Sequence, residues 1–360
     1  ILSRLPLLGM ETDAPTYEDV LDRLVVSHEW MGERFEQVLR ALPEDILLLM
    51  GAVSVIVIAD DIRPAGYSPL TAGVYIDPQW LWFTLEELGT VSQAPDYRSD
   101  FGNSLQFVSS VRYVSGEERA FGGSNLTATE DRTLDEVTPR MAFVLFHELA
   151  HANDVFPPST WDNLDGSETI VGAVDSAQAV SLALQGEYPL TSELMYALAE
   201  VDFLGRPATE EELQVTAEMV GVEFDGDQAT DHYAYASIEE DMAMLFEEAM
   251  MRYHYGFERD VAFSTPISGA DGCDAYVVKW GERSRLGNQD IRVRAQFVAS
   301  AILPSLDLVE FFESLPEPTR LRNGVSWCDS IHLDDTSQLE IRSDWVQPIP
   351  WAEVSGPQIR

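Results

Sequence analysis

The sequence predicts a helix-rich α+β fold with a helical N-terminal region and a small C-terminal appendage. Apolar residues recur at helical spacing over 17–42, and a run rich in Val, Ile and Leu covers 46–60. The chain has 360 residues, 45% of them hydrophobic, which is enough for one large domain with an appendage or for two domains. We place an N-terminal lead-in and helix, a central domain and the appendage at 1–45, 46–262 and 263–360.

The N-terminal third is expected to alternate between helix and strand. The helical pattern over 17–42 ends at Pro43, since proline does not continue a helix. Three later segments are predicted to contain strands: 46–60, 72–87 and 104–114. In 72–87 the strand is followed by a break at Pro78 and a short helix.

A long helix is expected from Thr138 to about Asp154. Thr138 can cap it, and Pro139 suits the first turn, where the missing N–H of proline has no partner. Two prolines then bar its continuation. Further helical patterns follow, about three of them within 165–222 and one over 238–255.

The composition changes after Ser264, where Gly, Pro and Asp become frequent. Here 276–280 is predicted as a strand and 291–303 as a helix, so we place a domain boundary near residue 262. Cys273 and Cys328 are either one disulfide or two inert thiols, and we favour the disulfide. A disulfide would place the protein in an oxidising compartment, so we expect an exported protein, whether periplasmic, cell-envelope or secreted.

The charge balance excludes some partners. The chain has 22 Lys and Arg against 62 Asp and Glu, a formal net charge of −40. Its electrostatic field repels nucleic acid and anionic membrane surfaces. The longest apolar run, Ile46–Ala59, is shorter than the roughly 18 residues that a membrane span requires, so we expect no integral membrane segment.

Two histidines lie four residues apart within the apolar segment FVLFHELAHAND, 143–154. On a helix, His147 and His151 lie about 40° apart around the axis, so they share one face, which Asp154 joins. The opposite side carries Met141, Leu145, Leu149 and Ala152, so the helix is expected to be buried nearly all round, with these three side chains as its polar stripe. Two imidazoles one turn apart can direct nitrogens at one Zn²⁺ ion.

Glu148 lies about 100° around the helix from His147, so it can reach a water molecule on the metal rather than the metal itself. A zinc hydrolase needs this arrangement, because the metal acidifies the water and the glutamate takes its proton. The alternative is that the motif arose by chance and that the histidines are core residues. The context of a capped, buried helix favours the metal site.

The motif His147-Glu148-Leu149-Ala150-His151 resembles that of the zincin metallopeptidases. The metzincin branch has Gly at 154 and His or Asp at 157, whereas this chain has Asp154 and Pro157. The combination of H-E-x-x-H-x-x-D with a later S-x-x-E-D-x-A looks like the gluzincin subgroup of anthrax lethal factor-like bacterial peptidases. The resemblance covers about 70–260 and implies a zincin-like catalytic domain with a helical insertion at about 160–230.

The resemblance implies Glu240 as the third zinc ligand, because the subgroup's ligand directly precedes D-x-A. Glu240 also fits a capping box with Ser237, in which the glutamate reaches back to the cap residue's N–H. Glu239 and Glu247 are the other candidates for the ligand. The subgroup often has a second glutamate four residues after the ligand, where this chain has Met244. Glu247, on the same helix face as Glu240, is the candidate to replace it.

Other polar residues near these motifs receive supporting roles. In such enzymes an upstream tyrosine contacts the substrate carbonyl, and Tyr233 matches best, with Tyr235 next. Asp154 is expected to accept the N–H of a ligand histidine and fix its ring, unless it bonds nearby backbone at the helix end. His232 and His254 flank the second helix. Either can donate to an oxyanion, or simply fill surface or core.

The sequence therefore predicts a zinc-dependent peptidase with one Zn²⁺ per chain and a peptide or protein substrate. Glu148 would act as general base and then pass the proton to the leaving amine, while Tyr233 polarises the oxyanion. The main alternative is a binding or assembly protein that keeps the zincin fold and the metal without turnover. A hydrolase that acts on a non-peptide amide is a second alternative.

Overall fold

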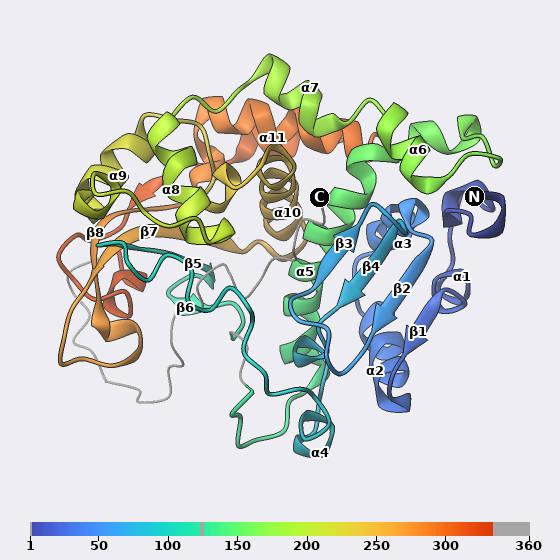
Figure 1. Cartoon of the computed structure of the whole chain (residues 1–360), viewed down its shortest axis with the longest axis horizontal. Coiled ribbons are helices and arrows are strands. Elements are labelled where there is room, and N and C mark those ends of the chain that lie inside the picture. The colour runs from blue at the N-terminus through green and yellow to red at the C-terminus, as the bar shows by residue number, and fades with distance from the viewer. Residues whose placement is uncertain (1, 123–125, 334–360) are drawn as a thin grey trace.

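A computed structural model of the chain describes residues 2–122 and 126–333 (Figure 1). The predicted α+β class is confirmed, because the chain forms many helices together with two separate sheets. The first sheet has three parallel strands and one antiparallel strand at its edge. In spatial order its strands are β1 (Leu24–Val26), β2 (Val55–Ile58), β4 (Gly73–Ile76) and β3 (Gly66–Ser68).

The N-terminal helices are shorter than the sequence predicts. The helical pattern over 17–42 is divided by β1, because its branched residues pair with β2, Val26 opposite Ile58. The segment 46–60 begins as helix rather than strand, since Ile46 and Leu49 both reach the core, and an unbroken apolar run does not reveal its period. The helices of this part are α1 (Tyr17–Leu21), α2 (Glu29–Leu39), α3 (Asp45–Leu49) and α4 (Leu85–Leu88).

The long central helix is α5, Leu134–Val155. Its N-cap lies five residues before the predicted cap, because Thr133 and Glu136 form a capping box in which each side chain bonds the other's backbone N–H. The predicted cap at Thr138 is therefore wrong, and its hydroxyl donates to the Leu134 carbonyl within the helix instead. Pro139 lies inside the helix. As expected, α5 is buried along almost its whole length.

The second sheet is antiparallel throughout. A strand is confirmed in each of the predicted segments 104–114 and 276–280, although the first begins only at Val108 and ends at Ser115, and the second extends to Arg283. Residue 262, where the predicted boundary lies, falls inside β7, so residues on both sides of it share this sheet. Residues 334–360 of the predicted appendage lie outside the described residues. In order, the strands are β6 (Glu118–Arg119), β5 (Val108–Ser115), β7 (Glu258–Pro266), β8 (Tyr276–Arg283) and β9 (Thr319–Arg320).

The predicted disulfide is confirmed. Cys273 and Cys328 are bonded, with 5.2 Å between their Cα atoms. Cys273 packs with Trp327 and Leu321 in a small hydrophobic cluster on one face of the second sheet, separate from the main core. The bond therefore fastens the last part of the described chain to the turn that precedes β8.

The region 160–230 is helical, as the sequence predicts, and leads into a second long helix, α10 (Ile238–Tyr255). Figure 1 shows α10 near the centre of the molecule, and it packs directly against α5. In the described residues, no helix is both long and apolar enough to cross a membrane. The other helices are α6 (Ile170–Ser176), α7 (Val180–Glu187), α8 (Glu193–Leu204), α9 (Ala217–Asp225), α11 (Gln289–Ile302) and α12 (Val309–Ser314).

Candidate metal centre

Packing of α10 on α5 brings three side chains to one point. His147 and His151 come from successive turns of α5, and Glu240 comes from the first turn of α10. Glu240 Oε2 lies 3.2 Å from His147 Nε2 and 3.4 Å from His151 Nε2. The two imidazole nitrogens lie 3.3 Å apart. The three atoms form a nearly equilateral triangle that could hold a metal ion.

The triangle is almost shut off from solvent. His147 and Glu240 are 2% and 3% exposed, and the side chain of His151, at 13%, is the more open member. Within the described residues, Glu240 Oε2 and His147 Nδ1 make no hydrogen bond of acceptable geometry. A buried carboxylate oxygen in this position calls for a positive charge beside it, which a metal ion or a protonated imidazole can supply.

The charges of the triangle are complementary. Burial by itself disfavours the ionised form of Glu240, but the two imidazoles outweigh it and hold its pKa well below the usual range. Burial likewise disfavours protonation of His151, but the carboxylate of Glu240 reverses this and raises the pKa of His151 to about 9. Glu240 is therefore an anion in the folded protein, as a metal ligand must be.

Glu148 lies next to the triangle, 1% exposed. Its Oε1 atom makes no hydrogen bond to the described residues, and the backbone N–H of Tyr67 on the edge strand β3 interacts with the carboxyl group. Burial raises the pKa of Glu148, while His147 and His151 act in the opposite direction. Glu148 is thus a buried carboxylate with an oxygen available to accept a proton.

Tyr233 contacts the triangle from the turn before α10. Its hydroxyl donates to Glu240 Oε1 over 2.8 Å, so the two oxygens of Glu240 have different tasks: one faces Tyr233 and the other faces the histidines. The ring packs edge-on against Phe203, with 4.9 Å between centroids. In this arrangement Tyr233 orients the third member of the triangle.

Replacing Tyr233 by Phe is expected to weaken metal binding about 10- to 100-fold, the usual effect of removing a hydrogen-bond partner of a metal ligand. The measurement is a competition titration with a chromophoric chelator. Tyr235→Phe is the matched control and should bind metal as the wild type does, because that hydroxyl donates to Asp227 instead. Equal affinity in Tyr233→Phe and wild type would show that the hydroxyl does not support Glu240.

Asp154 lies on α5 one turn beyond His151, but its bonds lead elsewhere. Both of its carboxylate oxygens accept hydrogen bonds from Ser181, one from the backbone N–H over 2.7 Å and one from the hydroxyl over 2.8 Å. Asp154 therefore accepts hydrogen bonds from the first turn of α7. The bond from a ligand histidine that the sequence analysis assigns to it is not among its contacts in the described part of the chain.

Four further candidates are not brought to the triangle. Glu247 accepts from the Tyr113 hydroxyl two turns further along α10. His254 pairs with Asp45 over 3.0 Å and stacks on Phe146. His232 is fully buried among aromatic rings, with Nδ1 3.4 Å from Asp202, and the Tyr235 hydroxyl is held by Asp227. These contacts give each of them a partner of its own.

Sequence reasoning did not find the contacts of Tyr67 with Glu148 or of Ser181 with Asp154. Neither residue belongs to a motif, and each reaches the site from a separate element. In the described residues, the three members of the triangle are the one group of His, Cys, Asp or Glu side chains arranged to hold a metal ion. Comparison with protein-family models, curated proteins and solved structures finds no match.

Proposed function

We propose that this chain is a zinc-dependent peptidase with a zincin-like catalytic domain, in which His147, His151 and Glu240 hold the ion. The observation that carries the proposal is the spacing of the triangle. Ligands about 2.0–2.1 Å from a tetrahedral zinc ion lie roughly 3.3–3.4 Å from one another. The three separations of 3.2, 3.3 and 3.4 Å correspond to this spacing. Two imidazoles and one carboxylate are also a donor set that zinc accepts.

The chemistry divides between the ion and the protein. A bound zinc ion would supply Lewis acidity, which lowers the pKa of a water molecule and polarises a carbonyl group. Glu148 would take a proton from water at Oε1, which is buried beside the triangle and makes no hydrogen bond to the described residues. As the water oxygen bonds the carbonyl carbon and the carbon–nitrogen bond breaks, Glu148 would return the proton to the nitrogen of the leaving amine.

We assign to Tyr233 the stabilisation of the negative charge that develops on the substrate oxygen, because its hydroxyl lies within the site, where it donates to Glu240. The packing of its ring on Phe203 limits the movement of the hydroxyl. The resemblance of the motif to peptidases supports a peptide or protein as substrate. The disulfide between Cys273 and Cys328 supports a location in an oxidising compartment, and we propose that the protein is exported.

The test is metal content followed by cleavage. We expect about one zinc ion per chain by elemental analysis, and cleavage of an unstructured protein that a chelator abolishes and added zinc restores. Protein that binds zinc but cleaves nothing across a broad peptide library would favour the binding or assembly protein. Cleavage of non-peptide amides alone would favour the second alternative. Active protein without zinc would overturn the proposal.

A further inference from the structure

A second group of buried charges lies beside α10, where Glu247 and Glu248 follow Glu240 by two turns. Three carboxyl groups surround one guanidinium, and all four side chains are at most 4% exposed. Arg259 of β7 pairs with Asp231, and its Nη1 lies 3.6 Å from Glu247 and 3.5 Å from Glu248. We call this group the α10 acid cluster; its members are Asp231, Glu247, Glu248 and Arg259.

The negative charges of the cluster outnumber the positive ones. If every carboxyl ionised, three negative charges would face one positive charge. Two other arginines near the cluster already have partners, since Arg285 pairs with Glu282 over 2.9 Å and Arg252 lies 3.6 Å from Glu258. Tyr113 of β5 is a further ionisable neighbour, and its hydroxyl donates to Glu247. The ionised cluster would therefore carry about two uncompensated charges in the protein interior.

Uncompensated buried charge is costly, and a carboxyl group avoids it by keeping its proton. Burial raises the pKa of Glu247 to about 8 and that of Glu248 to about 7, with Arg259 acting in the opposite direction in both cases. Glu247 Oε2 also lacks a hydrogen bond to the described residues, as expected where the geometry does not stabilise a full negative charge.

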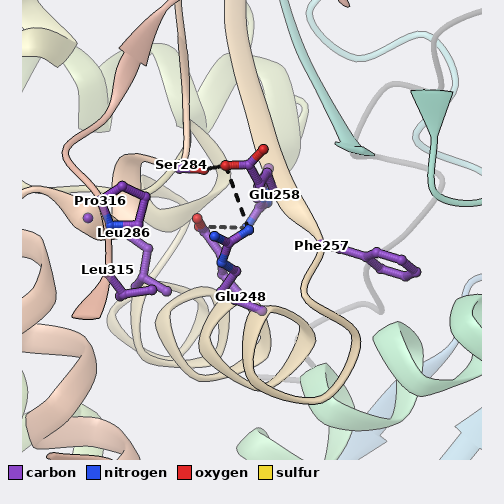
Figure 2. A pocket seen from close by; sticks show the side chains of 10 residues that line it. Glu248, Phe257, Glu258, Ser284, Leu286, Leu315 and Pro316 are labelled. Atoms are coloured by element: carbon purple, nitrogen blue, oxygen red, sulfur yellow. Dashed lines mark hydrogen bonds and ion pairs between the residues drawn. The ribbon is translucent and has the colours of Figure 1, made fainter. Parts of the chain in front are cut away.

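The cluster borders a small pocket. Figure 2 shows the pocket into which Glu248 faces, between the end of α10, the start of β7 and the segment that holds Leu315. Ser284 and Glu258 form a hydrogen bond of 2.9 Å at its rim. Glu248 lines this pocket and lies 3.5 Å from Arg259, so we expect the cluster to exchange protons with water on this side.

We propose that the α10 acid cluster is a proton lock, which holds at least one proton at neutral pH and loosens the attachment of α10 to β5 and β7 when alkaline conditions remove it. The attachment includes the bond from Tyr113 and the ion pairs to Arg259, which join the helix to the second sheet. This inference does not depend on the proposed peptidase activity.

The direction of the pH effect follows from the proton count. In the unfolded chain a glutamate titrates near about 4.3, whereas in the folded protein the pKa of Glu247 is about 8. Between these values the folded protein holds a proton that the unfolded chain has lost. The free energy of unfolding therefore falls as the pH rises from about 4 to about 8, and this contribution stops changing above that pH.

The experiment is urea unfolding of the full chain at pH values from 5 to 9, in wild type, Glu247→Gln and Glu248→Gln. A folded protein that holds one extra proton loses about a factor of ten in its folding equilibrium constant for each pH unit. We therefore expect the wild type to show this additional fall and a variant without the retained proton to lack it. Glu313→Gln, an exposed residue on α12, is the matched control and should follow the wild type.

Infrared spectroscopy gives a second readout that does not require a stable variant. The folded wild type should show the carbonyl band of a protonated carboxyl group at pH 7, and the band should disappear as the pH passes about 8. Loss of the excess pH dependence in either variant would support the lock. The wild-type slope in both variants, or a folded wild type without the band at pH 7, would overturn it.

Discussion

Replacing Glu148 by Gln should lower the kcat of peptide hydrolysis by roughly 10²- to 10⁴-fold, the range that general acid–base catalysis contributes. Gln has nearly the same shape but cannot take a proton from water or return one to the leaving amine. Glu148 is not a member of the triangle, so zinc content should stay near that of the wild type. The measurement combines steady-state kinetics with elemental analysis.

Two comparisons make this result specific. Glu87→Gln changes another buried glutamate, one that pairs with Arg34 far along the chain from the triangle, and should leave kcat unchanged. The KM of Glu148→Gln should change much less than kcat, because the lost interaction belongs to the transition state. Full activity in Glu148→Gln would eliminate Glu148 as the base and with it the proposed mechanism.

Replacing Glu240 by Gln should weaken zinc binding by more than the roughly 10- to 100-fold typical for loss of a residue that only supports a ligand. The amide removes the negative charge that the two imidazoles stabilise and places neutral groups around a divalent cation. Activity should fall in parallel with metal content. Competition titration and residual activity at saturating zinc separate weaker binding from impaired chemistry.

Glu239→Gln is the matched control, since Glu239 precedes Glu240 on the same helical turn but is not a member of the triangle. It should bind zinc as the wild type does. Retained zinc and activity in Glu240→Gln would contradict the assignment of Glu240 as a ligand. Its position at the start of α10, where its backbone N–H donates to the Ser237 side chain, would then be structural.

Local sequence signals were sufficient for the parts of the fold that depend on local chemistry. The strand and turn near Pro78, the start of α10 at Ser237 and the strand β8 follow from turn residues, caps and branched residues. The first part of 46–60 was assigned to the wrong class, because a fully apolar segment looks the same as helix or as buried strand. The start of α5 was misplaced, although Thr133 and Glu136 carry the capping-box spacing that marks it.

In the candidate site, too, some residues follow from local sequence and others only from the packing of distant elements. His147, Glu148 and His151 lie on one helix, so their arrangement follows from its period. Glu240 joins them only through the packing of α10 on α5, and the resemblance to a family, rather than local physics, indicated it. Tyr67 and Ser181 reach Glu148 and Asp154 from distant elements, and the sequence around each of them carries no motif that predicts the contact.

The helix α10 carries Glu240 in its first turn and the acid cluster about 10 Å further along, at 1.5 Å per residue. Two binding equilibria in one protein obey reciprocity. If protonation of the cluster changes zinc affinity by some factor, zinc must change the proton affinity of the cluster by the same factor. Titration of the cluster with and without the metal would therefore measure the communication between the two sites without any substrate.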